Sequence, residues 1–297
     1  MNDTSNPPAP RHRPVLVREV LDALEPRPGQ RFVDATVGAG GHARLVAERL
    51  MPGGRLLGLD RDATMLALAA PRLEGLPITL VHANFEDLHL ALREAEMDRV
   101  DGFFADLGFC SDQMDNPERG LAFSRDGPLD MRLDLDEGET AADLLARMNE
   151  RDLADVIYQF GEERFSRRIA RKISESRRQT PLRTTKQLAD LVRSCVPRSG
   201  RIDPATRTFQ ALRIAVNDEL RVLKRLLEVL PDCVAPGGRA ALLSFHSLED
   251  RLVKQAFRDR AKWRDGCRKP IEASEAEASE NPRSRSAKLR WAIRCDE

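Results

Sequence analysis

An acid followed by closely spaced glycines is the feature of this chain that could do chemistry. The apolar run Phe32-Val-Asp34 predicts a buried strand, and Gly38 and Gly40 come directly after it. Glycine supplies backbone freedom where a side chain would block the close approach of a ligand. Asp60 ends the next apolar run, where a carboxylate can accept both hydroxyls of a ribose. These residues predict a nucleoside-cofactor site.

A helix predicted over residues 41–50 would direct its N-terminal amides and positive dipole end at that glycine turn. Two cofactors fit. The spacing Gly38-x-Gly40-x-x-Ala43 matches the relaxed dinucleotide fingerprint of an NAD enzyme. S-adenosylmethionine is favoured by Asp34, whose carboxylate can meet an ammonium group. It is favoured also by the strand ends further along, which carry Asn84 with Phe85, suited to adenine, and Asp106.

The segment after the fourth predicted strand, Asp106 to Ser111, is the expected reaction centre. Cys110 could attack carbon six of a pyrimidine and so activate carbon five, although no base or cation is adjacent in the sequence. Methylation of an exocyclic amine needs no covalent step; Asp106 and the Ser111 hydroxyl are suitable acceptors for the amine hydrogens. A protein or small-molecule methyl acceptor stays open from these residues alone.

Composition narrows the class of protein. The chain has 297 residues with 48 Lys+Arg and 48 Asp+Glu, so net charge predicts no partner. Two local basic runs, over residues 164–178 and 283–294, suit an anionic partner. The five cysteines form no CxxC pair, which fits a reducing compartment and indicates no zinc site. No apolar run approaches membrane-spanning length, and the N-terminus lacks a signal core. We therefore predict a cytoplasmic protein without membrane contact or metal site.

The order of predicted elements indicates an α/β doubly wound sheet with an all-helical insertion. We expect residues 1–12 to be disordered, residues 13–110 and 206–297 to form the cofactor domain, and residues 111–205 to form an inserted loop plus a helical substrate-recognition domain. Periodicity predicts one long helix from Thr206 to Leu230 that stops at Pro231. A fifth strand from Arg239 to His246, a helix capped by Ser247, a mobile acidic loop over residues 272–280 and a last strand over residues 288–294 should follow.

Several longer phrases resemble one family. They are Gly-Ala-Gly-Gly-His at 38–42, Glu-Arg-Gly at 118–120, Asp-Gly-Pro-Leu-Asp-Met-Arg at 126–132, Thr-Arg-Thr-Phe-Gln-Ala-Leu-Arg-Ile-Ala-Val-Asn at 206–217 and Ser-Phe-His-Ser-Leu-Glu-Asp-Arg at 244–251. Together, from His12 onward, they are similar to the ribosomal RNA small-subunit methyltransferase H family, also called MraW. The resemblance implies a class I methyltransferase fold and S-adenosylmethionine-dependent methylation of the N4 amine of one decoding-region cytidine in bacterial 16S rRNA, within the small ribosomal subunit.

The resemblance also implies site residues. The cofactor contacts carried over are Gly40, Gly41, His42, Asp60, Phe85, Asp106 and Gln113, beside Asp34 and Gly38 from the residue argument. Where the family usually has two serines and a proline, this chain has Cys110-Ser111-Asp112, which weakens the role of a nucleophilic cysteine.

The two basic runs are the expected RNA surface. The predicted substrate contacts are Arg164, Arg167, Arg168, Arg171, His246, Arg285 and Lys288. The first four lie within about two helical turns, so some of them must share a helical face. We predict no protein partner. Two other functions remain open from the sequence: an NAD-dependent oxidoreductase that uses the same glycine loop, and a non-catalytic RNA-binding assembly factor.

Overall fold

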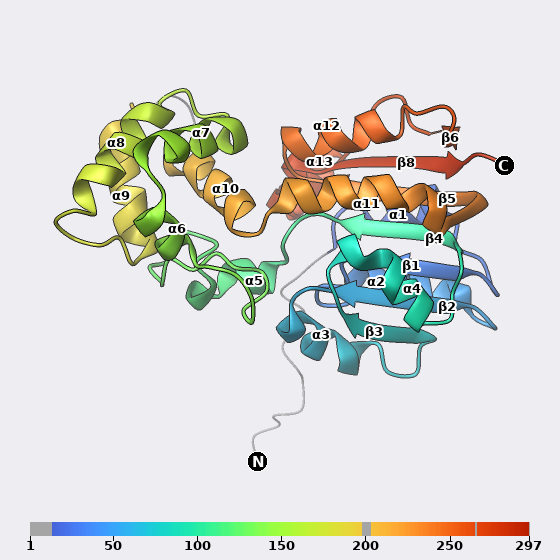
Figure 1. Cartoon of the computed structure of the whole chain (residues 1–297). Coiled ribbons are helices and arrows are strands. Elements are labelled where there is room, and N and C mark those ends of the chain that lie inside the picture. Colours follow the sequence, from blue (N-terminus) through green and yellow to red (C-terminus); the bar gives the residue numbers. More distant parts are fainter. Residues whose placement is uncertain (1–13, 198–202, 265, 297) are drawn as a thin grey trace, which may run out of the picture. The chain divides into compact units, whose positions relative to one another are not determined.

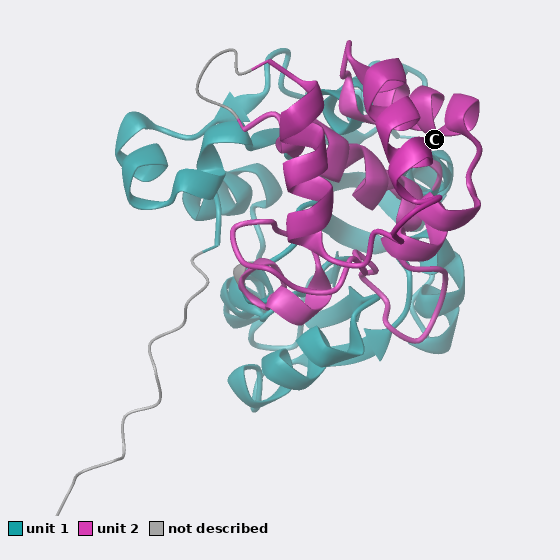
Figure 2. Ribbon diagram, turned by 90° about the vertical axis from the view of Figure 1, so that its left-hand side faces the viewer, with its two compact units in different colours: residues 1–112, 222–297 teal, residues 113–221 magenta. Residues whose placement is uncertain are grey.

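The computed structural model describes residues 14–197, 203–264 and 266–296, and the predicted disorder of residues 1–12 lies outside them. The chain divides into two compact units, coloured separately in Figure 2. Residues 1–112 and 222–297 form the first, here called the sheet unit, and residues 113–221 form the second, the helical unit. No helix in the described ranges has both the length and the apolar character needed to cross a membrane.

The sheet unit is built on one mixed sheet with the order β3-β2-β1-β4-β5-β8-β6. Five strands are parallel, and β8 runs antiparallel beside β5 (Figure 1). The strands are β1 (Arg31–Asp34), β2 (Arg55–Asp60), β3 (Ile78–His82), β4 (Val100–Asp106), β5 (Val234–Ser244), β6 (Trp263–Arg264), β7 (Ile271–Glu272) and β8 (Lys288–Arg294). The sequence order reverses between β1 and β4, which is where open α/β sheets bind ligands.

Helices cover both faces of this sheet, which is why its central strands are apolar along their length. One face packs against α1 (Val17–Leu24), α2 (Gly41–Leu50) and α3 (Ala63–Ala69). The other packs against α4 (Leu88–Glu94), α11 (Glu219–Cys233) and α12 (Ser247–Ala256). The predicted doubly wound α/β sheet is confirmed.

The helical unit contains no long strand in its described part. Its helices are α5 (Ser111–Asp115, which begins at the unit boundary), α6 (Ala141–Arg147), α7 (Glu150–Gly161), α8 (Ser166–Ser176), α9 (Thr185–Cys195) and α10 (Ala205–Val216). Thr184 and Gln187 form a capping box at the start of α9. We had expected α10 within the cofactor domain, but it packs against α7 and α9.

The prediction of one long helix from Thr206 to Leu230 is wrong, because the helix is interrupted between α10 and α11. Asn217 ends α10 and Asp218 takes a left-handed backbone conformation with φ of 50°. The Asn217 side chain bonds to backbone groups of residues 131 and 133, so tertiary contacts override the helical periodicity. Pro231 does not stop the second helix, which continues to Cys233 on a buried face.

Three further predictions need correction. The acidic stretch 272–280 is not a loop: β7 ends at Glu272, and Ser274 then accepts a bond from the Glu277 backbone to cap α13 (Glu275–Glu280). A capping hydroxyl and acids in the first turn stabilise a helix start there. The fifth strand begins earlier than expected, at Val234, and ends at Ser244. The N-cap of α12 is His246 rather than Ser247.

Candidate cofactor and catalytic site

Three aspartates converge at the carboxyl ends of neighbouring strands. Asp34 ends β1, the strand between β2 and β4, and it stands opposite Gly58 on one side and Phe104 on the other. Asp60 and Asp106 each lie two residues beyond those partners. The three carboxylates therefore surround the point at which the strand order reverses, as the sequence predicted.

Asp60 organises the glycine loop between β1 and α2. Gly38 and Gly40 have φ of 53° and 88°, a region that residues with a Cβ rarely enter. The Gly38 amide donates to Asp60 Oδ2 at 2.7 Å, and the Asp62 amide donates to Oδ1 at 2.9 Å. A carboxylate offers about four acceptor positions. Asp60 therefore holds the loop and retains acceptor capacity for ligand hydroxyls.

A second anchor of this loop was not predicted. Arg72, in the short helix after α3, donates from Nη1 to the carbonyl oxygen of Ala39 at 3.0 Å. The loop is thus held on one side by a carboxylate and on the other by a guanidinium. No local motif marks Arg72, because only the fold brings it to residue 39.

Asp34 is the least satisfied of the three acids. It is almost completely buried, its Oδ1 accepts the Thr36 amide at 3.1 Å, and its Oδ2 has no hydrogen-bond partner among the described residues. Burial raises the pKa of Asp34 to about 7, the Thr36 bond opposes the rise, and the charges of Asp106 and Asp60 add to it. A buried acid in this state favours a cationic ligand.

Asp106 lies beside it with a similar environment. Its backbone amide donates to Thr36 Oγ1 at 2.6 Å, and its Oδ1 accepts the Gly108 amide at 3.0 Å. Burial raises the pKa of Asp106 to about 7, and the charge of Glu249 contributes to the rise. Burial likewise raises the pKa of Asp60 to about 6. A carboxylate with a pKa near 7 can take up a proton at neutral pH.

The fit of a cationic nucleoside can be judged from these groups. The site offers an unpartnered buried carboxylate oxygen, a second carboxylate with acceptor capacity, and a loop of glycines at the N-terminus of a ten-residue helix. Two positively charged groups and a ribose, as in S-adenosylmethionine, match this donor and acceptor set. A neutral ligand would leave Asp34 Oδ2 uncompensated.

Cys110 lies close to the same loop. It is buried, a methyl group built on Gly38 would lie 3.8 Å from its Cβ, and its thiol donates to Met65 Sδ at 3.1 Å. A thiol held against a methionine sulfur has no cation beside it in that contact. That contact supplies no activation of the kind that a nucleophilic cysteine requires.

The His42 side chain makes contacts within the protein. Its ring is buried, Nε2 donates to the carbonyl oxygen of Val15 at 2.9 Å, and the ring packs against Phe104 with centroids 4.8 Å apart. The backbone of His42, in the first turn of α2, remains suitable for a cofactor contact. Phe85 begins a short helix three residues after β3 and is partly buried against the core.

His246 is also engaged locally. As the N-cap of α12, its Nδ1 accepts the Glu249 amide at 3.4 Å, and its Nε2 lies 3.1 Å from Glu249 Oε1 without the alignment of a hydrogen bond. Glu249 in turn accepts the Phe245 amide at 2.8 Å. Sequence reasoning missed Glu249 and Thr36, the two residues that couple to Asp106. Glu249 stands in the phrase 244–251, which was the available signal.

The remaining predicted residues are spread over both units. Arg164, Arg167, Arg168 and Arg171 are exposed at or before α8, and Arg171 lies 3.7 Å from Glu150. Arg285 donates to the carbonyl oxygen of Ala278 at 3.1 Å, and Lys288 begins β8. Gln113 is buried in the helical unit. Ser111 begins α5, and its side chain lies outside the described part of the structure.

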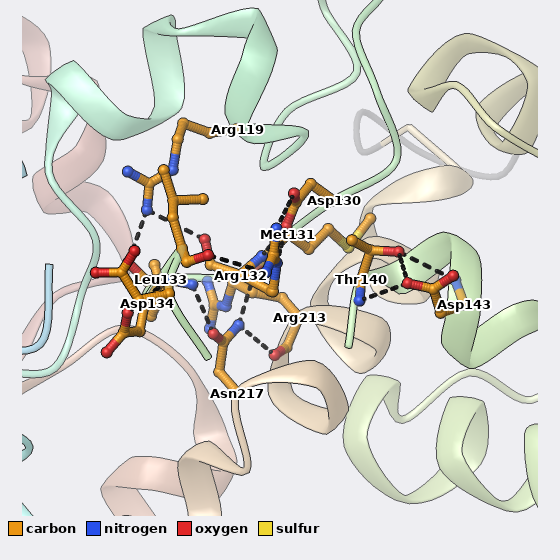
Figure 3. Close-up of polar contacts among 12 residues, drawn as sticks. Arg119, Asp130, Met131, Arg132, Leu133, Asp134, Thr140, Asp143, Arg213 and Asn217 are labelled. Atoms are coloured by element: carbon orange, nitrogen blue, oxygen red, sulfur yellow. Dashed lines mark hydrogen bonds and ion pairs between the residues drawn. The ribbon is translucent and has the colours of Figure 1, made fainter. Parts of the chain in front are cut away.

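A second polar cluster, within the helical unit, joins three of the quoted phrases (Figure 3). Asn217 accepts the Leu133 amide at 2.7 Å and donates to the carbonyl oxygen of Met131 at 2.8 Å. The buried Arg119 donates to the carbonyl oxygens of Arg132 and Leu133 at 3.1 and 2.7 Å. The segment predicted as an irregular loop is irregular, but these side chains hold its backbone.

Comparison with known proteins completes the description. The family model described as the MraW methylase family matches residues 9–295. Ribosomal RNA small subunit methyltransferase H of Sorangium cellulosum is 50% identical, over 97% of this chain and 93% of its own. The protein of the same name from Thioalkalivibrio sulfidiphilus is 48% identical, over 98% and 99%. That of Pelobacter propionicus is 46% identical, over 94% and 97%.

Proposed function

We propose that this chain, which belongs to the MraW methylase family, methylates the N4 amine of one decoding-region cytidine in bacterial 16S rRNA within the small ribosomal subunit. It is an S-adenosylmethionine-dependent methyltransferase. The observation that carries the site assignment is the partnerless buried oxygen of Asp34 between Asp60 and Asp106. The proposed substrate is supported by the names of the relatives and by the family resemblance.

The cofactor would be held by residues of the sheet unit. Asp60 would accept the ribose hydroxyls, the loop of Gly38, Gly40 and Gly41 would lie against the cofactor, and Asp34 would face its positive charge. When bound, S-adenosylmethionine supplies an electrophilic methyl group on a sulfonium. Phe85 and the backbone of His42 complete the proposed set in this unit. Gln113, which belongs to the helical unit, stays a contact that the family resemblance implies.

Asp106 is the proposed catalytic acceptor. Its carboxylate would hold an amine hydrogen and so favour the tetrahedral geometry that an attacking nitrogen needs. As the nitrogen forms its bond to the methyl carbon, the bond from that carbon to sulfur would break and leave its electron pair on sulfur. The proton that the nitrogen loses can pass to Asp106, whose raised pKa of about 7 suits that transfer. Ser111 is the proposed second acceptor. Cys110 has no part in this scheme.

Nucleoside analysis tests the reaction. Mass spectrometry of small-subunit rRNA from cells with and without the gene should show N4-methylcytidine lost at one position, and the purified protein should restore it. Parallel assays on naked rRNA and on assembled small subunits distinguish the two forms of substrate. We expect methyl transfer to the assembled subunit. Unchanged N4-methylcytidine in the deletion strain, or a product methylated at carbon five, would contradict the proposal. The proposed substrate is consistent with a cytoplasmic enzyme.

Exposed arginines of α8 are the proposed phosphate contacts in the helical unit. Replacement of Arg167, Arg168 and Arg171 by Ala should weaken binding to small subunits and flatten its dependence on salt, because each phosphate contact releases counterions. Affinity for S-adenosylmethionine should stay unchanged.

The control variant loses the same number of positive charges. In it Ala replaces Arg18, Arg27 and Arg44, each of which pairs with an acid of the sheet unit. If both triple variants give the same salt slope as the wild type, the assignment of α8 to the RNA surface fails. His246, Arg285 and Lys288 of the sheet unit stay proposed contacts, to be tested by single replacement in the same assay.

A further inference from the structure

The residues just before α1 are pinned against the start of α2. Val15 and Leu16 are buried in the core between the sheet and helices α1, α2 and α3. The Val15 carbonyl oxygen accepts the hydrogen bond from His42 Nε2 at 2.9 Å. His42 is the second residue of α2, the helix that follows the glycine loop. A change in the position of residues 14–16 would therefore shift the N-terminus of that helix.

Pro14 occupies the space beside Gly41. A methyl group built on Gly41 would overlap Pro14 Cγ and would lie 3.4 Å from both Pro14 Cβ and Cδ. The backbone of Gly41 needs no unusual φ, since it is absent from the positive-φ glycines. The glycine at this position is thus explained by the close approach of Pro14 rather than by the backbone conformation.

A glutamate from the C-terminal part of the chain holds the other end of this segment. Glu277, in α13, accepts the Leu16 amide on Oε1 at 2.8 Å. Leu16 has φ of 54°, a left-handed conformation that a leucine adopts only where its surroundings enforce it. The Glu277 bond also satisfies an amide at the start of α1 that would otherwise lack an acceptor there.

The same contacts reach the strand that carries Asp106. The His42 ring packs on Phe104, two residues before Asp106 in β4, and the Phe104 carbonyl oxygen accepts the Ala35 amide at 2.8 Å. Ala35 follows Asp34 directly. Residues 14–16 are therefore connected through one buried ring to both acids.

We propose that Pro14–Leu16, called here the N-terminal clamp, sets the position of the α2 N-terminus for the cofactor. His42, through its imidazole, and Glu277 are its positioning residues. The proposal rests on the cofactor site proposed above. It means that α13, which is far from that site in the sequence, helps to position it. It also explains the glycine at position 41 by the contact with Pro14 and not by a ligand.

A suppressor pair tests the contact between Pro14 and Gly41. Gly41→Ala alone should weaken S-adenosylmethionine binding about 10-fold, the scale of a typical coupling between a site and a neighbouring element. Adding Pro14→Ala removes Cγ and Cδ and should restore the dissociation constant to within about threefold of the wild-type value. A double variant as weak as Gly41→Ala would mean that the glycine admits the ligand itself. Normal binding by Gly41→Ala would equally overturn the clamp.

Replacement of Glu277 tests the other anchor. Glu277→Ala should raise the KM for S-adenosylmethionine about 10-fold and leave kcat and the KM for the ribosomal subunit unchanged. Glu277→Gln keeps an acceptor oxygen and should restore the wild-type KM. Glu275→Ala, at an exposed position of the same helix, is the matched control. Loss of stability with an unchanged KM would show a purely structural role.

The two proposals fail in different ways. A wild-type protein that does not bind S-adenosylmethionine in calorimetry contradicts the cofactor site. Wild-type binding that the clamp variants leave intact contradicts the clamp alone. If Glu277→Ala does not fold, the suppressor pair still decides, because it is scored on recovery of binding.

Discussion

Two regions of this molecule bury polar side chains, and they do so in opposite ways. In the helical unit, Asn217 and Arg119 direct their polar atoms at backbone groups of residues 131–133. In the sheet unit, Asp34, Asp60 and Asp106 crowd together, their pKa values rise, and one oxygen of Asp34 has no partner in the described structure. Both regions contain residues from the most distinctive phrases of the sequence.

This difference distinguishes buried polar groups that hold the fold from those that bind a ligand. Buried polar groups in native proteins are nearly always hydrogen-bonded, and Asn217, whose side-chain oxygen and nitrogen both bond to the backbone, explains its own presence by the backbone that it holds. Crowded, partly unsatisfied acids cost stability, and such groups are found where a ligand or a reaction compensates them. Distinctive residues of both kinds look alike in the sequence, and the predictions below test whether the two regions differ as described.

The largest effect is expected at Asp106. Asp106→Asn removes the group proposed to take the proton and should lower the rate of methyl transfer at least about 100-fold. Affinity for S-adenosylmethionine should change much less. Single-turnover transfer to small subunits measures the rate, and calorimetry measures the affinity.

Cys110→Ser serves as the matched control beside Asp106 and should retain most activity, because the thiol donates to a methionine sulfur and takes no part in the proposed transfer. A folded, cofactor-binding Cys110→Ser protein without activity would revive a covalent mechanism at carbon five of the pyrimidine.

Removal of the scaffold amide should act on stability rather than on chemistry. Asn217→Ala leaves the Leu133 amide and the Met131 carbonyl without their buried partner and should lower the free energy of unfolding by about 2–4 kcal/mol. Asn149→Ala, which removes an exposed cap of α7, should lower it by only about 1 kcal/mol. Denaturant titration compares the two; equal losses would remove the distinction drawn for Asn217.

Asp60 shares features of both regions, since it holds the glycine loop and keeps acceptor capacity. Asp60→Ala should weaken S-adenosylmethionine binding about 10- to 100-fold, equal to about 1.5–3 kcal/mol for lost bonds to a charged group. Asp60→Asn retains one acceptor oxygen and should lose less. An unchanged dissociation constant in calorimetry would show that Asp60 does not contact the ribose.

The smallest effect is a pH dependence of cofactor binding. Asp34 has a pKa of about 7 in the free protein, and a cationic ligand binds its ionised form better. Affinity for S-adenosylmethionine should therefore rise about tenfold from about pH 6 to about pH 7.5. The Asp34→Asn variant, which has no proton to lose there, should show a flatter profile. Equal profiles would place the titrating group elsewhere.

Stability of the free protein should follow the opposite trend. A carboxyl whose pKa is higher in the folded than in the unfolded state binds more protons when folded, so unfolding becomes easier as pH rises between the two values. This window runs from the usual value of 3.8 to about 7 for Asp34 and Asp106, and to about 6 for Asp60. The cofactor should reduce the loss, which melting curves with and without it can measure.

The elements around the cofactor loop were predictable because their signals are local. Apolar runs, glycines and a following amphipathic segment placed α2 and β8 at the bounds that the structure has, and the end of β2 at Asp60. The same reasoning identified the acids at three strand ends, since parallel strands of a doubly wound sheet bring their carboxyl ends to one edge. The residue types and their spacing were enough for that part of the site.

Other features depended on contacts between segments far apart in the chain. The break after Asn217, the anchoring of the glycine loop by Arg72 and the bond from Leu16 to Glu277 have no local signature. The sequence alone determined which residues could bind a cationic nucleoside. Only the tertiary structure decided which buried polar groups were already satisfied, because a hydrogen-bond partner from another segment leaves no trace in the periodicity of either one.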